Sequence, residues 1–179
     1  MPESNGFNMF DYKDIAEISV KVIGAIVALY AFVAYFLRKE IRLFLNLRRP
    51  IFFIIPKKGG SKVPAKEMEI EIDAIKKNGF FKVATEVNDY QAFSPQKKYG
   101  LVVLGYDREM DGFDEIMSKV KQIQCPLIVY TYGKNTGESM PEHLTVLNGY
   151  PWALISNFKL TLINSVFTTL ATFSYDSTK

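Results

Sequence analysis

A lysine- and glycine-rich stretch, PKKGGSKVP at 56–64, directly follows the apolar run IFFII at 51–55. Lysines supply positive charge, and glycines let backbone N–H groups approach a ligand closely where a helix begins. This combination can hold a phosphate, although its spacing matches neither GxxxxGK[ST] nor GxGxxG, and a solvated loop near acidic lipid is the alternative. The residues assigned to this ligand-binding loop are Lys57, Lys58, Gly59, Gly60, Ser61 and Lys62.

Two further loops follow apolar runs. The stretch YTYGKNTGES at 130–139 offers an aromatic ring on which a base could stack, together with amide and hydroxyl groups that could read its edge. The loop after GLVVLGY at 100–106 is the third candidate, and ordinary strand exits are the alternative for both. The candidate ligand-binding residues of these loops are Gly105, Asp107, Thr131, Tyr132, Lys134, Asn135 and Thr136.

Residues suited to catalysis are sparse. The chain has a single histidine, His143, and a single cysteine, Cys125, which excludes an internal disulfide and a cysteine-rich metal site and favours a reducing compartment. Asp107, Glu109 and Asp111 cluster in what is best interpreted as a solvated turn, and Asp111 is placed to cap the following helix. We therefore expect no catalytic residue, no metal site and no cofactor. An enzyme that cleaves nucleotides or NAD is the least supported alternative.

The run ISVKVIGAIVALYAFVAYFL at 18–37 predicts a transmembrane helix. A helix of that length spans about 30 Å, its apolar residues surround every face, and its one charge lies in the first turn. A cleaved signal peptide is the alternative, but residues 1–17 are acidic and RKEIRLFLNLRR stands where a cleavage site would be.

The charges on either side of this helix predict its orientation. Between Arg38 and Lys62 there are eight Lys or Arg residues and one acid, whereas residues 1–17 hold one Lys and four acids. The positive-inside rule therefore places residues 1–17 outside the inner (cell) membrane and residues 38–179 in the cytosol, as a single-pass protein. Residues 38–49 form a basic, amphipathic juxtamembrane helix that could lie against acidic headgroups.

One face of the transmembrane helix is smaller and more polar than the others. Small residues four apart allow close helix packing in lipid, so this face predicts self-association into a homo-oligomer, and a pore lined by it would be a further step. Chance is the alternative, because transmembrane helices are rich in Gly and Ala. The residues of this stripe are Lys21, Gly24, Ala28, Ala31, Tyr35 and Arg38.

From residue 50 to 179 the chain alternates between short apolar runs and helical patterns. We expect strands at 51–56, 80–87, 100–106 and 126–132, a fifth short strand at 144–147, and helices at 64–78, 111–123 and 156–173. Strands that alternate with helices indicate an α/β domain with a parallel sheet, of the flavodoxin-like or Rossmann-like kind. In such sheets ligands bind outside the carboxyl ends of the strands, which is where the three candidate loops lie.

The last helix is expected to be capped by Ser156 or Asn157. Its apolar residues at helical spacing are expected to form the buried face, and they are Ile163, Val166, Phe167 and Leu170.

The segment YGLVVLGYDREMDGFDEIMSKVK, followed by PLIVYTYG, resembles the middle of a response-regulator receiver domain over residues 78–134. The resemblance implies a flavodoxin-like fold. The position of a receiver's phosphoacceptor aspartate holds Gly105, and Pro56 and Lys57 replace the acidic pair expected after the first strand. A phosphorelay switch is therefore not implied.

The layout of one membrane helix, a basic connector and a small α/β domain resembles that of membrane-anchored antiphage effectors. In those proteins a CARF-like or TIR-like domain senses a nucleotide second messenger and the membrane helices depolarise the cell. The resemblance implies a sensor-effector in antiviral defence, with the lipid bilayer, a second copy of the chain and a nucleotide-like ligand as partners and no direct DNA binding. A membrane-tethered, receiver-like interaction module without a small ligand is the alternative.

Overall fold

A computed structural model describes residues 12–55, 66–94, 99–106, 110, 112–131 and 144–173. The chain divides into two compact units, Met1–Arg42 and Leu43–Lys179.

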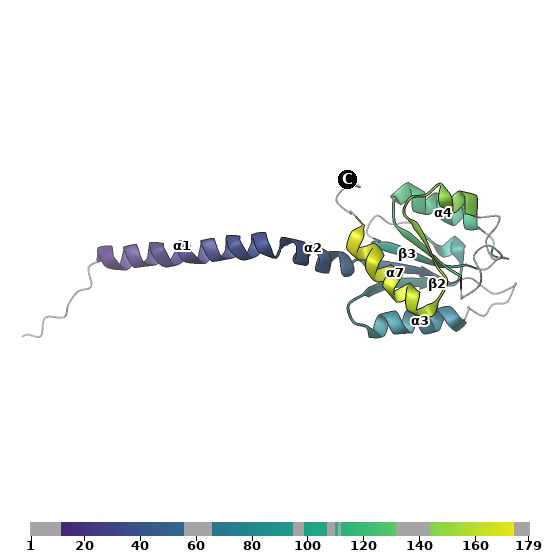
Figure 1. Cartoon of the computed structure of the whole chain (residues 1–179), viewed down its shortest axis with the longest axis horizontal. Coiled ribbons are helices and arrows are strands. Elements are labelled where there is room, and N and C mark those ends of the chain that lie inside the picture. The colour runs from purple at the N-terminus through teal and green to yellow at the C-terminus, as the bar shows by residue number, and fades with distance from the viewer. Residues whose placement is uncertain are drawn as a thin grey trace, which may run out of the picture. The chain divides into compact units, whose positions relative to one another are not determined.

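The first unit consists of α1 (Tyr12–Phe36) and the beginning of α2 (Arg38–Leu47), which are drawn in purple and blue in Figure 1. Within α1, the stretch Asp14–Phe36 is long and apolar enough to cross a membrane, and none of it is buried. At Leu37 the helical hydrogen bonds continue, because its N–H donates to the Val33 carbonyl at 2.9 Å and its carbonyl accepts from Ile41 at 2.8 Å. The stripe residues from Lys21 to Tyr35 therefore lie on α1, and Arg38 begins α2.

The second unit is built on a sheet of five parallel strands in the order β2-β1-β3-β4-β5. This order is that of the flavodoxin-like fold, so the predicted fold class is confirmed. We call the edge at which the strands begin the amino edge, and the edge at which they end the carboxyl edge. The strands are β1 (Pro50–Ile54), β2 (Lys82–Val87), β3 (Leu101–Gly105), β4 (Leu127–Tyr130) and β5 (Ala153–Ser156).

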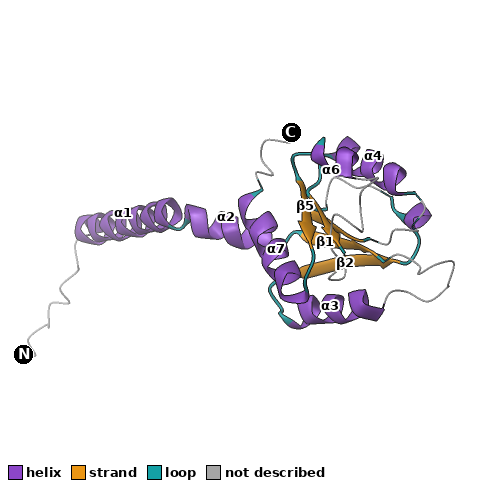
Figure 2. Ribbon diagram, turned by 45° about the vertical axis from the view of Figure 1, so that its right-hand side comes forward, coloured by secondary structure: helices purple, strands orange, loops and turns teal. Residues whose placement is uncertain are grey.

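Helices cover both faces of this sheet. Figure 2 shows α3 and α7 on one side of the strands and α4 and α6 on the other. Successive side chains of a strand point to opposite faces, so Phe52 packs in the core beneath α4 whereas Phe53 packs in the core beneath α3 and α7. The helical segments are α3 (Lys66–Lys77), the 3₁₀ turn η1 (Tyr90–Ala92), α4 (Phe113–Ile123), α6 (Leu144–Asn148) and α7 (Lys159–Thr172).

The connection between β2 and β3 contains only the η1 turn among its described residues. Aromatic packing holds this connection on the sheet. The Phe52 ring lies 5.0 Å from the ring of Phe93 and 4.9 Å from that of Tyr99, measured between centroids, and all three side chains are buried. Buried aromatic rings therefore cover the sheet at this connection, a role that amphipathic helices such as α3 and α4 have elsewhere in the domain.

The prediction of a fifth strand at 144–147 is wrong. Residues Leu144–Asn148 form the short helix α6, in which Leu147 is buried against the core beneath α4. The fifth strand is instead Ala153–Ser156, which pairs with β4. A four-residue apolar segment does not distinguish a strand from a helical turn by periodicity, which is why this assignment failed.

The predicted buried face of α7 is partly wrong. Val166 and Leu170 are buried as expected, but the third fully buried residue is Leu162, whereas Phe167 is 46% exposed. The buried row is thus spaced at four residues, and Phe167 lies one position beyond it. The expected cap is also wrong: the helix begins after Phe158, whose N–H donates to the Thr161 hydroxyl at 3.1 Å.

Cys125 is expected to resist alkylation in the folded protein. Its side chain is buried, its Sγ donates to the Tyr99 carbonyl at 3.6 Å, and burial raises its pKa to about 12. At about pH 8 only roughly one thiol in ten thousand would then be ionised, and the thiolate is the reactive form. Mass spectrometry after iodoacetamide treatment should find the native chain unmodified and the denatured chain modified. Rapid modification of native protein would contradict the burial of this thiol.

Candidate functional site

The carboxyl edge brings the three candidate loops together. Strands β1, β3 and β4 are neighbours in the sheet, and each of the loops begins where one of them ends. The pairing continues past the strands, because the Tyr106 N–H donates to the Tyr130 carbonyl at 2.8 Å and the Thr131 N–H donates to the Ser156 carbonyl at 3.0 Å. Neighbouring strands lie about 4.8 Å apart, so the loops start within about 10 Å of one another.

Two of the predicted ligand-binding residues belong to the described part of the chain. Gly105 is the last residue of β3 and is paired with Tyr130, so it lies beside Thr131, which follows β4. The structure thus brings these two together at the carboxyl edge. The predicted residues that lie outside the described residues are Lys57, Lys58, Gly59, Gly60, Ser61, Lys62, Asp107, Tyr132, Lys134, Asn135 and Thr136.

The exits of β4 and β5 carry a polar cluster. The buried Thr131 hydroxyl donates to the Asn157 side-chain oxygen at 2.8 Å, and the Ser156 and Thr161 hydroxyls lie 3.1 Å apart. Sequence reasoning treated Ser156 and Asn157 only as helix caps. The available signal was the change from the apolar ALI to the polar SN, which is what a strand end at a binding edge looks like.

A second polar group lies on the α3 side of the same edge. Tyr130 ends β4 with its side chain buried, and burial, with the charges of Glu71 and Glu67 adding to it, raises its pKa to about 12. Glu71 itself is buried on α3, among Met68, Ile72 and Ile75. Sequence reasoning missed Glu71, although its position between apolar residues at helical spacing was a usable signal.

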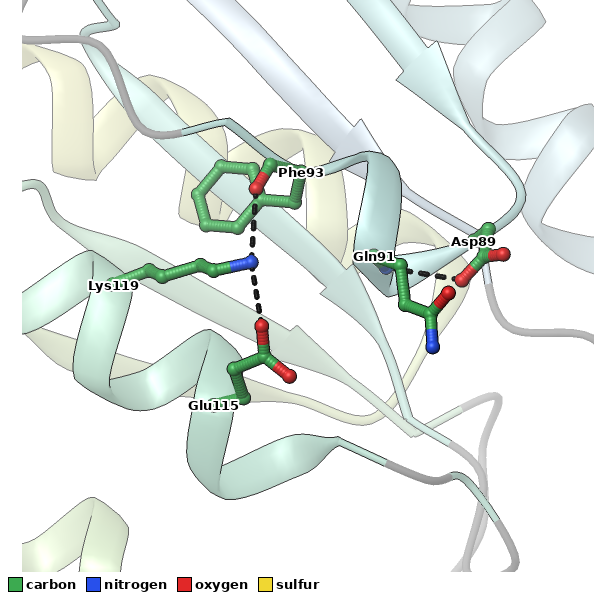
Figure 3. A network of polar contacts seen from close by, with 5 residues as sticks. All are labelled: Asp89, Gln91, Phe93, Glu115 and Lys119. Carbon is green, nitrogen blue, oxygen red and sulfur yellow. Dashed lines mark hydrogen bonds and ion pairs between the residues drawn. The ribbon is translucent and has the colours of Figure 1, made fainter.

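A network of polar contacts fixes η1 against α4 on the other side of the edge. The Lys119 ammonium donates to the Phe93 carbonyl at 3.2 Å and pairs with Glu115 at 2.7 Å, and the Gln91 N–H donates to Asp89 at 3.0 Å (Figure 3). Lys119 belongs to α4 and bonds to the end of η1, so it joins the β2–β3 connection to α4, the helix that follows β3.

Substituting Gly112 by alanine is expected to destabilise the domain. Gly112 has φ +77°, and a Cβ there would lie 2.2 Å from the Tyr90 ring. The backbone strain alone costs about 1–2 kcal/mol, and displacement of the ring adds to it. Gly79→Ala is the matched control, because Gly79 has φ +72° but open space around it. Chemical unfolding of the two variants should show a larger loss for Gly112, and equal losses would mean that Tyr90 moves freely.

Charge at the carboxyl edge is unevenly distributed among the described residues. Asp89, Asp114 and Glu115 lie at the ends and beginnings of elements there, and helix dipoles stabilise the last two at the start of α4. Lys66, at the start of α3, is a described cation at this edge, and the sequence adds the lysines at 57, 58, 62 and 134. No group of three or more potential metal-ligating side chains occurs within the described residues.

No protein-family model matches the chain, and no curated protein matches it. Among solved structures, it is similar to the response regulator ChrA of a heme-sensing two-component system, with 12% identity and a TM-score of 0.44 over 69% of this chain. The chain spans 57% of that protein. It is also similar to a conserved protein from Enterococcus faecalis V583, with 12% identity and a TM-score of 0.43, over 68% of this chain and 98% of the other. Neither is described as a CARF-like or TIR-like protein.

Proposed function

We propose that this protein is a membrane-anchored sensor whose α/β domain binds a nucleotide-like anion at the carboxyl edge of its sheet. The observation that carries the proposal is the strand order β2-β1-β3-β4-β5. In this order the chain leaves β1 and β3 in opposite directions, which opens a crevice where α/β proteins bind ligands. The stretch that contains Lys57, Lys58 and Lys62 follows β1 in the chain, and β1 ends at this crevice.

The chemistry of the three loops supports an anion with an attached base. Lysines and backbone N–H groups ahead of α3 suit a phosphate, because a helix N-terminus favours negative charge. The loop after β4 brings Tyr132 for stacking and Asn135 and Thr136 for hydrogen bonds to a base. A cyclic or linear oligonucleotide offers both groups.

The membrane part of the proposal rests on α1. Within its 23-residue candidate stretch, Asp14–Phe36, the part from residue 18 onward would cross the inner membrane, with residues 1–17 outside. Ligand binding between protomers would then change how copies of the Gly24–Ala28 face pack, and so alter the bilayer. A role in antiviral defence is the furthest extension of this scheme.

Ligand capture tests the proposal. The full chain would be purified in detergent, incubated with cell extract and with a panel of cyclic oligonucleotides, and analysed by mass spectrometry for what co-elutes. We expect a retained nucleotide. Absence of any retained nucleotide from both sources would overturn the sensor and turn attention to a protein partner.

A membrane-tethered interaction module is the second candidate, favoured by exposed apolar side chains on β5 and α7. Phe158, between these two elements, is 63% exposed, Leu154 on β5 is 42% exposed and Phe167 on α7 is 46% exposed. Such residues on neighbouring elements suit a protein interface. If this is their role, Phe167→Glu should lose a captured protein that wild type retains, whereas Ile70→Glu on α3, which is equally exposed, should keep it.

A further inference from the structure

Among the described residues of the α/β domain, acids gather at the carboxyl edge of the sheet, where Lys66 is also exposed, and cations gather at the amino edge. Helices that connect parallel strands run back against them, so they begin at the carboxyl edge and end at the amino edge. The described acids Glu67, Glu69, Asp114 and Glu115 begin α3 and α4 and thus lie at the carboxyl edge. Cations end the same helices and begin the strands at the amino edge: Arg48, Lys77, Lys82 and Lys121 are all exposed there.

These cations are not neutralised by the described acids. Lys77, Lys82 and Lys121 form no ion pair with a described residue, whereas Lys76 pairs with Glu86 at 2.5 Å. The described acid nearest to the amino edge along its element is Asp73, one turn before the end of α3. The amino edge is therefore a cationic surface.

One exposed and two half-buried aromatic residues lie on the same edge. Phe80, between α3 and β2, is 62% exposed and has Lys77 and Lys82 as near neighbours in the chain. At the opposite end of the edge, Trp152 precedes β5 and packs edge-on against Phe173 at 5.3 Å between ring centroids. Both rings line an open groove of about 380 Å³. Cations interleaved with partly exposed aromatic rings are typical of surfaces that meet lipid headgroups.

The chain itself delivers this edge to a membrane. Only residues 37–49 separate Phe36, the end of the candidate span, from Pro50, the first residue of β1 at the amino edge. At ~1.5 Å per helical and ~3.3 Å per extended residue, they reach about 30 Å at most. A surface tethered so closely meets headgroups at high effective concentration.

We infer that the amino edge of the α/β domain is a docking surface for anionic lipid headgroups. The inference rests on the membrane anchoring proposed above but not on a nucleotide ligand. Attraction of exposed lysines to an anionic leaflet acts within about a Debye length, ~8 Å at physiological salt, so docking is reversible and sensitive to salt. Docking would leave the carboxyl edge, at the other end of the strands, open to the cytosol.

The single tryptophan makes this testable in the full chain. Trp152 lies on the proposed surface and is the only tryptophan of the sequence. The protein would be placed in nanodiscs of phosphatidylcholine, with and without phosphatidylglycerol, that carry a headgroup spin label, and quenching of its fluorescence would be measured. We expect strong quenching only with phosphatidylglycerol, and its loss at high salt.

Two variants with the same charge change supply the control. Lys82→Glu at the amino edge should lower the ratio of docked to undocked domain on the order of tenfold. Lys66→Glu, exposed at the opposite end of α3, should leave it unchanged. Unchanged emission of both variants in phosphatidylcholine alone would show that the fold is intact.

The outcomes separate the two proposals. Failure of the chain to enter nanodiscs would overturn the membrane anchor and the docking surface with it. Entry without lipid-dependent quenching, or quenching that Lys82→Glu leaves intact, would overturn the docking surface alone and leave these cations for an acidic protein partner. Either result would leave nucleotide capture in detergent unaffected.

Discussion

Replacing Lys57 and Lys58 together by glutamate is expected to lower the affinity for a nucleotide-like anion by at least about 100-fold. A hydrogen bond to a charged group contributes about 1.5–3 kcal/mol, so the loss of two such contacts accounts for that factor, and the new negative charges would add repulsion. The neighbouring acids Asp114 and Glu115 cannot replace these contacts, because carboxylates repel an anion.

The measurement is a titration of the detergent-purified chain with the nucleotide identified by capture. Lys77→Glu/Lys82→Glu is the matched control, since it makes the same charge change at the amino edge, away from the proposed ligand. Its affinity should remain within a few-fold of wild type, because exposed charges more than a Debye length apart are largely screened. An equal loss in both double variants would show that net charge, and not a site, governs binding.

Phe52→Ala is expected to destabilise the domain by about 3–5 kcal/mol, a large part of the stability of an ordinary domain. Phe52 is 2% exposed, and its ring contacts those of Phe93 and Tyr99. Its removal would leave a cavity and would release the β2–β3 connection, which has no α-helix among its described residues. Urea unfolding followed by Trp152 fluorescence would measure the loss.

Phe53→Ala is the control for this second variant. Phe53 is equally buried in the same strand but packs in the opposite core, beneath α3 and α7. We expect a similar loss of global stability for both. Only Phe52→Ala should also speed amide hydrogen exchange at residues 90–93, because only that ring holds η1 in place. Equal exchange in the two variants would mean that the Lys119 contacts alone are enough.

Much of the fold is predictable because its strands are continuous apolar runs. The run IFFII is buried on both faces, as are LVVLG and LIVY, and such runs are typical of central parallel strands. The fifth strand, ALIS, is an edge strand of only four residues with alternating exposure. Its apolar pattern is no clearer as a strand signal than that of LTVL, which forms a helix. Size also misled: Phe167 is the largest apolar residue of α7 but is not in its buried row.

The candidate site was less accessible from sequence, because its polar contacts join distant segments. Thr131 was predicted as a ligand-binding residue, but its partner Asn157 is 26 positions away and its contact follows from the pairing of β4 with β5. The close approach of the Tyr90 ring to Gly112 likewise could not be predicted from the sequence around either residue. The assignment of the lysines at 57, 58 and 62 to a ligand remains a prediction of the sequence.

The position of β1 has a mechanical consequence. This strand, Pro50–Ile54, connects α2 to the lysine-containing stretch at 56–64, and it is hydrogen-bonded on both sides, to β2 and β3. A force along β1 would shear its pairings with β2 and with β3. All the hydrogen bonds of both pairings would then resist the force together, and they would not open one after another. Such a strand behaves as a stiff rod of about 16 Å. A displacement at one of its ends would therefore arrive at the other almost undiminished.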